Sequence, residues 1–252
     1  MNNILFICAL AEEKTALTKM LGPLIEQHLI SAPLQLNLQQ YRQQQLDIYV
    51  CESGMGNVNA GVKLALILAA QEIGQIVLVG VGGALSSALE IGEMVISDSV
   101  IQHDYYSSLD QGDYLMRPGE LILEPAQAQS HDPIIRSVGS QLDLGSLQHS
   151  QVKVSYGLIA SGCEFVGTAT RKQAIHHQCQ HALLVDMEAC AIAQVAQQHN
   201  IPFVIAKTVS DKLHSDGSIG SDFSSFLSNA SRNAAIIAAL IIDKACALQL
   251  QK

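Results

Sequence analysis

The sequence of 252 residues has no tryptophan, and only 15% of its residues are charged. Hydrophobic residues make up 48%, and the mean hydropathy is +0.23. Disordered chains have the opposite balance, low hydrophobicity with high charge, so this composition argues against a mainly disordered chain. The length is enough to bury a sizeable core, and we expect residues 1–252 to form a single domain.

The sequence also lacks a run of basic residues. It has 14 Lys and Arg against 23 Asp and Glu, which gives a formal net charge of −9. Nucleic-acid binding draws most of its affinity from clustered cations on phosphates, so we expect no nucleic-acid partner. A mononucleoside remains a possible ligand because it carries little or no charge.

No apolar run is long enough to cross a membrane. Residues 234–242 are apolar but end at Asp243, far short of the roughly 20 residues that a membrane span needs, and they are typical of a buried helix face. The first residues lack the basic segment of a signal peptide. The six cysteines form no CxxC pair, which is typical of free thiols in a reducing compartment. We therefore expect a cytoplasmic protein without a membrane partner.

Short apolar runs alternate along the chain with longer helical patterns. The runs predict strands at residues 3–9, 34–40, 46–51, 76–81, 93–101, 152–161, 183–185 and 203–209. The helical patterns lie at residues 12–21, 58–73, 168–177, 187–199 and 222–248. Residues 105–150 are rich in Ser, Gln, Asp and Pro and indicate surface excursions with one weak helix. This alternation predicts an α/β fold, a three-layer αβα domain with a central mixed sheet.

Three acidic residues follow three different predicted strands. Glu13 and Glu188 lie at helix starts, where a carboxylate is favourable to the helix dipole, and Asp211 suits a cap or turn. Each position has this structural explanation when taken alone. Ligands of open α/β sheets bind at the carboxyl ends of strands, so the three acids together favour a functional site.

A glycine-rich segment, residues 80–85, invites comparison with dinucleotide-binding loops. The third fingerprint glycine is missing because Leu85 stands there, and little room for a helix remains before the strand at residue 93. A close approach of the backbone to a ligand or to another strand explains these glycines equally well. A second cluster, His176, His177, Cys179 and His181, fits no common zinc spacing, and we expect no metal.

Eight segments, in order, resemble the purine nucleoside phosphorylase/uridine phosphorylase superfamily, and within it the 5'-methylthioadenosine/S-adenosylhomocysteine nucleosidases. They are residues 7–13, 53–60, 80–85, 95–98, 162–166, 185–189, 206–211 and 222–227. The resemblance implies a nucleoside phosphorylase-like fold without a cofactor. It also implies cleavage of an N-glycosidic bond through a ribosyl cation, with adenine leaving.

The resemblance assigns two catalytic roles. Asp211 matches the general acid that protonates N7 of adenine, and Ser210 would hold it in place. Glu13 matches the carboxylate that orients and deprotonates the attacking water. A carboxyl group in a partly desolvated pocket can keep its proton near neutral pH, which suits the acid.

The resemblance also implies how the substrate is bound. Glu188 would bind the ribose hydroxyls, and Met187 would pack against the sugar. Phe165 would stack on the base, with backbone groups of Phe165 and Val166 reading its edge. Met55 and Phe223 match apolar residues near the 5' substituent. Because the equivalent of Phe223 lies near the dimer-related pocket in the family, a homodimer is implied.

Water and phosphate are the two candidate nucleophiles. Phosphorylases of this superfamily place an Arg and a Ser or Thr where this chain has Leu78 and Val81, and carboxylates in the first loop would repel phosphate. We therefore expect hydrolysis of 5'-methylthioadenosine or S-adenosylhomocysteine. A futalosine hydrolase and a phosphate-dependent purine nucleoside phosphorylase remain alternatives. The chain departs from the nucleosidases at Val81, Asp186 and Lys207, where Ser, Glu and Arg are usual.

Overall fold

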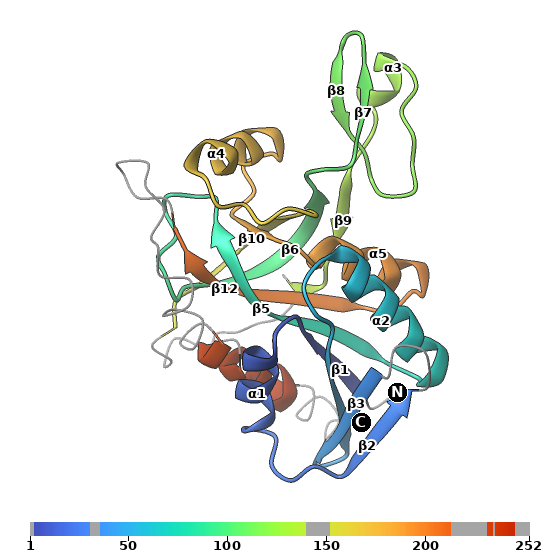
Figure 1. Ribbon diagram of the computed structural model, residues 1–252, viewed down its shortest axis with the longest axis vertical. Helices are drawn as coiled ribbons and strands as arrows, with labels where there is room; N and C mark the ends of the chain where they lie inside the picture. The colour runs from blue at the N-terminus through green and yellow to red at the C-terminus, as the bar shows by residue number, and fades with distance from the viewer. Residues whose placement is uncertain (1–2, 31–35, 140–151, 213–230, 234, 245–252) are drawn as a thin grey trace.

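The computed structural model describes residues 3–30, 36–139, 152–212, 231–233 and 235–244 (Figure 1). Its strands are β1 (Asn3–Cys8), β2 (Glu26–Ile30), β3 (Leu36–Gln43), β4 (Leu46–Glu52), β5 (Gln75–Ala84), β6 (Met94–Gln102), β7 (Tyr106–Leu109), β8 (Gly112–Leu115), β9 (Ile134–Arg136), β10 (Val154–Ser161), β11 (Leu184–Asp186) and β12 (Phe203–Asp211). Its helices are α1 (Ala11–Thr18), α2 (Asn57–Ala70), α3 (Pro125–Ala128), α4 (Ala169–Gln178) and α5 (Ala189–Gln198). Residues 231–233 and 235–244 are also helical.

The strands form a mixed sheet with the order β11-β10-β6-β12-β5-β1-β4-β3-β2. Its centre is parallel, since β5 pairs in parallel with both β1 and β12, whereas β12 runs antiparallel to β6. The sheet also curls back on itself, because β11 pairs with β10 and with β5. The strands β5, β12, β6, β10 and β11 therefore close into a ring, and the mixed α/β fold expected from the sequence is confirmed.

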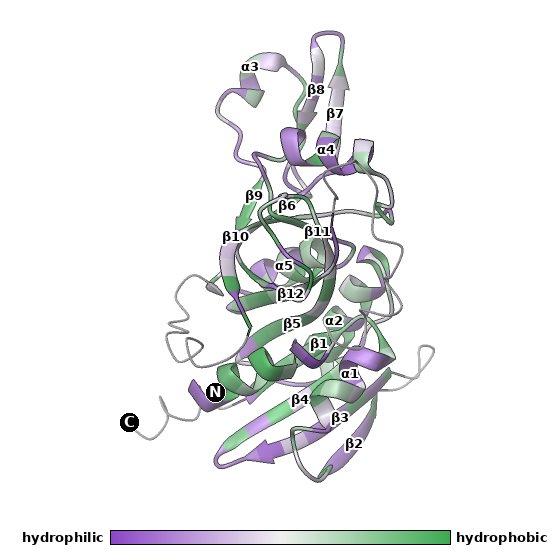
Figure 2. Ribbon diagram, turned by 90° about the vertical axis from the view of Figure 1, so that its left-hand side faces the viewer, coloured by the Kyte–Doolittle hydropathy of each residue, from purple (hydrophilic) through white to green (hydrophobic). Residues whose placement is uncertain are grey.

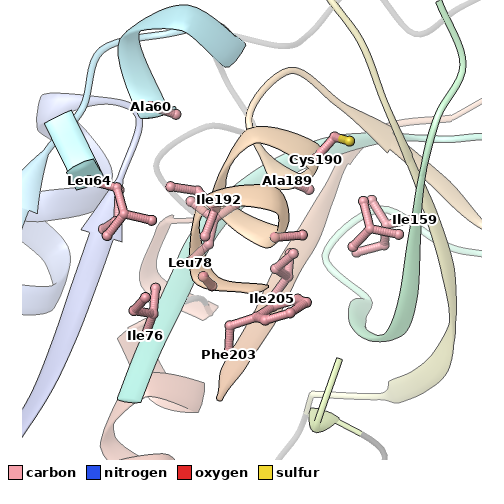
Figure 3. Packing of buried hydrophobic residues seen from close by; sticks show 14 of the residues in the cluster. Ala60, Leu64, Ile76, Leu78, Ile159, Ala189, Cys190, Ile192, Phe203 and Ile205 are labelled. Atoms are coloured by element: carbon pink, nitrogen blue, oxygen red, sulfur yellow. The ribbon is translucent and has the colours of Figure 1, made fainter. Parts of the chain in front are cut away.

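Helices cover both faces of the sheet, as the alternation of buried side chains along the strands requires. One face of β5 carries Ile76 and Leu78, which pack in a cluster with residues of α2 and α5 (Figure 3). The other face carries Val77 and Val79, which pack with α1 and the helical residues 235–244. The expected three layers are thus present.

The apolar residues gather where the layers meet. Figure 2 shows β5 and β12 in the colours of apolar residues, while α4 is mostly polar. All nine residues of β12 are buried, which fits a central strand covered on both faces. Among the described residues, no helix is long and apolar enough to cross a membrane.

Three parts of the chain differ from the prediction. The glycine segment is not a loop, because β5 continues through it to Ala84. The strand β2 was missed because it is an exposed edge strand without a buried face. Residues 105–139 hold the β7–β8 hairpin and β9 besides the short helix α3, and the hairpin projects from the sheet (Figure 1). The predicted helix at residues 222–248 is described only at residues 231–233 and 235–244, where it is helical.

Candidate active site

A pocket opens at the carboxyl ends of β1, β5, β11 and β12, where the sequence predicted a site. Its lining residues are Ala9, Leu10, Glu13, Met55, Val81, Gly82, Gly83, Glu164, Phe165, Val166, Val185, Asp186, Met187, Glu188, Ser210 and Asp211. The pocket thus brings together all the predicted site residues that the structure describes. Phe223 lies outside the described residues.

Glu13 lies in the first turn of α1 and is almost fully buried. Its carboxylate accepts hydrogen bonds from the backbone N–H groups of Ala9 and Leu10 at 2.8 and 2.9 Å, and from Val81 at 3.0 Å. Burial raises the pKa of Glu13, while Lys207 and the backbone donors act in the opposite direction. The result is a fixed carboxylate that binds a proton more readily than an exposed glutamate.

Asp211 ends β12 just after a break in the strand register, and it lines the pocket. The hydroxyl of Ser210 lies 2.9 Å from Oδ1 of Asp211 and 3.1 Å from the carbonyl oxygen of Gly82. A hydroxyl has a single proton to donate, so the two acceptors share it. The hydroxyl of Ser210 therefore lies between Asp211 and β5, within hydrogen-bond distance of both.

Lys172 is a residue of this site that the sequence analysis missed. It lies on α4, its side chain is fully buried, and its ammonium forms an ion pair with Oδ2 of Asp211. A signal was available: Lys172, Ile175 and Cys179 follow helical spacing, and all three are buried. A lysine on an apolar stripe requires a buried partner.

Glu188 stands at the N-cap of α5 and is held from two sides. Its Oε1 accepts from the backbone N–H of Gly56 at 2.9 Å, and its Oε2 lies 3.1 Å from Nζ of Lys207. Lys207 also pairs with Asp186 at 2.9 Å, and Asp186 accepts from the backbone N–H of Ala189. Burial by itself lowers the pKa of Lys207, but Asp186, Glu188 and Glu13 together raise it, so the ammonium stays charged.

Apolar side chains form the more open part of the pocket. Phe165 and Met55 are 68% and 58% exposed, whereas Val166 is buried and packs with α4 residues. Met187 lies between the buried residues Asp186 and Glu188. A flat aromatic face and a thioether at the mouth of the pocket suit an apolar or aromatic ligand.

The glycines of β5 are explained by close approaches of other groups. A Cβ on Gly80 would lie 2.7 Å from Oε1 of Glu13. A Cβ on Gly82 would lie 2.8 Å from the carbonyl oxygen of Val185 and would collide with Leu184, both on β11. The glycines therefore make room for the acid and close the ring of strands, and the interpretation as a close approach to another strand is confirmed.

The charges of the lining are of one sign. Among the described residues that line the pocket, five are acidic and none is Lys or Arg; the acids are Glu13, Glu164, Asp186, Glu188 and Asp211. Lys172 and Lys207 lie behind this lining, each in contact with a carboxylate. In the part of the chain that the structure describes, no group of three or more His, Cys, Asp or Glu side chains is arranged to hold a metal ion.

Comparisons with known proteins show what the sequence and the fold of this chain resemble. A family model described as "Phosphorylase superfamily" matches residues 3–243. A protein of Staphylococcus aureus named 5'-methylthioadenosine/S-adenosylhomocysteine nucleosidase is 34% identical over 184 residues, which cover 73% of this chain and 76% of that protein.

Solved structures share the fold. A variant of the Helicobacter pylori nucleosidase of the same name, with 5'-methylthioadenosine in its active site, has a TM-score of 0.82 and 21% identity over 97% of this chain and 99% of that one. Futalosine hydrolase of Helicobacter pylori has a TM-score of 0.80 and 22% identity over 96% of this chain and 98% of that one.

Proposed function

Since the chain belongs to the phosphorylase superfamily, we propose that it hydrolyses the N-glycosidic bond of 5'-methylthioadenosine, S-adenosylhomocysteine or both, releasing adenine. One observation carries the proposal: Glu13, Glu188 and Asp211 converge on one pocket whose described lining contains no Lys or Arg. This lining suits a developing ribosyl cation and a water nucleophile, and it opposes a phosphate dianion.

The base end of the pocket is assigned to Asp211 and Phe165. Adenine leaves readily only when N7 is protonated, and Asp211 supplies a carboxyl group on the pocket wall for this proton transfer. Phe165 offers its ring face to the purine, and the neighbouring backbone of Val166 lies at the same wall.

The sugar end is assigned to Glu188 and Glu13. An ionised carboxylate has about four acceptor positions, so Glu188 keeps free positions for ribose hydroxyls beside its bonds to Gly56 and Lys207. Glu13 is held by backbone donors at a fixed place, where it orients water and takes its proton. Its raised pKa makes it a better proton acceptor than an exposed glutamate.

A futalosine hydrolase is the second candidate, because its solved structure is as similar to this chain as those of the nucleosidases. It would use the same acids and differ at the 5' substituent. Met55, beside that predicted subsite, is 58% exposed, so a large 5' group would extend from the pocket toward solvent. The chemistry is therefore common to both candidates, and the substrate distinguishes them.

The test is an assay of the purified protein with 5'-methylthioadenosine in phosphate-free buffer, followed by separation of the base and sugar products. We expect adenine and methylthioribose. A strict requirement for phosphate, with a ribose 1-phosphate as product, would refute the hydrolase proposal. A panel of S-adenosylhomocysteine, futalosine and inosine then ranks the substrates by kcat/KM.

A further inference from the structure

Lys172 is a buried charge that the proposed reaction does not use directly. Its side chain is fully buried on α4, beside an apolar stripe that continues through Ile175 and Cys179. A buried ammonium is costly unless a carboxylate compensates it, and that carboxylate is Asp211. Lys172 is not among the lining residues of the pocket, so it reaches a bound ligand only through Asp211.

We propose that Lys172 is a positioning residue that fixes the carboxyl group of Asp211 toward the leaving base and supplies the counter-charge for the carboxylate that remains after proton transfer. The inference rests on the proposed function, in which Asp211 protonates that base. It adds a residue from α4, outside the strand ends, to the machinery of the site.

The first part of the role is geometric. Lys172 contacts Oδ2 of Asp211 while the hydroxyl of Ser210 lies 2.9 Å from Oδ1, so both oxygens are held from behind the pocket wall. A Cβ on Gly83 would lie 3.1 Å from Nζ of Lys172 and 3.2 Å from Oδ2 of Asp211. The lack of a side chain at this one position of β5 therefore leaves room for the ion pair. A carboxyl group held at both oxygens presents its remaining lone pairs in one direction.

The second part of the role is electrostatic. The ammonium of Lys172 contacts Oδ2 of Asp211, so a positive charge lies beside the carboxylate that forms when the base is protonated. The other cation near the pocket, Lys207, is already balanced by Asp186 and Glu188. The remaining charged groups around the pocket are Glu13 on α1 and Glu164, which pairs with Arg171. Lys172 is therefore the cation in direct contact with the acid.

In the proposed step, one proton moves from Asp211 to the leaving base. The O–H bond of Asp211 breaks as an N–H bond forms on N7 of the base, and the glycosidic electron pair leaves with the base. Asp211 is then a carboxylate, which Lys172 stabilises by the ion pair seen in the structure. The ion pair thus represents the site after proton transfer, and the acid must regain a proton before the next turnover.

The test compares kcat and KM of the wild type, Lys172→Met and Lys172→Arg on whichever nucleoside the wild type cleaves. Met has a similar length without the charge. We expect Lys172→Met to lower kcat roughly tenfold, because the carboxyl group is no longer fixed and the carboxylate formed by proton transfer loses its counter-charge. KM should stay within about twofold of the wild-type value, because Lys172 does not line the pocket. Lys172→Arg, which keeps the charge, should restore most of the wild-type kcat.

Arg171→Met is the matched control, since it removes a cation from the same helix that pairs with Glu164. It should leave kcat and KM unchanged. An unchanged kcat in folded Lys172→Met would overturn the proposal, even with lowered stability, because a structural role alone predicts that result. If Lys172→Met does not fold, Lys172→Gln, which is neutral and polar, takes its place in the same comparison. A failure of the proposed function is separate, since it would appear in the wild-type products.

Discussion

At the scale of single residues, the three carboxylates of the pocket are held in three different ways. Glu13 is held by backbone N–H groups, Glu188 by one backbone N–H and an ammonium, and Asp211 by a hydroxyl and an ammonium. These environments differ in charge although the side chains are alike. Different roles for identical functional groups follow from such differences in environment.

Asp211→Asn tests the acid. The amide keeps the shape of the side chain but has no carboxyl proton to give, so we expect kcat to fall by about 10²-fold or more. The free energy of unfolding should also change, because Lys172 loses its buried counter-charge. The measurement is steady-state kinetics together with circular dichroism to verify folding. Unchanged activity would show that another group protonates the base.

The raised pKa of Glu13 predicts how the activity falls at acidic pH. It must be ionised to accept a proton from water, and burial raises its pKa, so activity should fall on acidification at a higher pH than an ordinary glutamate would give. The isosteric Glu13→Gln should be inactive. An acid limb within the ordinary glutamate range would contradict this assignment.

The same shift predicts a stability difference. Between the ordinary pKa of a glutamate and the raised one, the folded state binds more protons than the unfolded state, so the contribution of Glu13 to the free energy of unfolding falls as pH rises. The unfolding free energy of the wild type minus that of Glu13→Gln, measured by urea denaturation, should therefore decrease as pH rises through this window.

Site residues could be predicted from the sequence where they directly follow a predicted strand. Glu13, Glu188 and Asp211 each follow a strand, and strand ends meet at one edge of a sheet, so their convergence was predictable. Lys172 comes from a helix, and its partner lies 39 residues away. Its helical spacing with Ile175 and Cys179 could have indicated a buried position, but only the folded structure brings Asp211 to it.

At the scale of elements, the closure of the strands into a ring was not predictable from local pattern. The apolar runs predicted most of the strands, but a short run such as β11 gives no indication that it pairs with both β10 and β5. Gly82 of β5 was the available sign, and its cause is a contact with Leu184 and Val185 of β11, about 100 residues further along the chain. This contact also sets the pocket, because β11 leads directly into Met187 and Glu188.

Gly82→Ala tests the ring. The added Cβ would collide with Leu184 and approach the carbonyl oxygen of Val185 to 2.8 Å, so β11 must shift. We expect a loss of about 2 kcal/mol in unfolding free energy, typical of overpacking, together with lower kcat/KM. Gly61→Ala is the control, since Gly61 lies within α2 and its Cβ would meet Ala191 of α5 at an ordinary 3.6 Å. It should stabilise the helix by up to about 1 kcal/mol. Equal stabilities of the two variants would contradict the close packing of β11 on β5.

At the scale of the whole molecule, the distribution of exposed apolar residues bears on assembly. Val58 and Val62 of α2 are 74% and 44% exposed and lie one helical turn apart, while Met55 precedes the helix and lines the pocket. Apolar side chains grouped on a surface commonly mark protein interfaces. An interface over α2 would adjoin the pocket and would partly cover its exposed mouth.

We therefore expect a homodimer that uses the α2 surface formed by Met55, Val58 and Val62. Val58→Asp with Val62→Asp places two charges on that surface, and burying them unpaired would prevent a stable interface, so the double variant should be a monomer by sedimentation. It should also have a raised KM, because the mouth of the pocket at Met55 loses its cover. Leu24→Asp is the control: this exposed apolar residue follows α1, a helix that packs on the opposite face of the sheet from α2, and its substitution should leave the dimer intact. A wild-type monomer, or a dimer that survives both aspartates, would place the interface elsewhere or remove it. The exposed Met55 would then face solvent, and the pocket would hold its substrate with the residues of one chain.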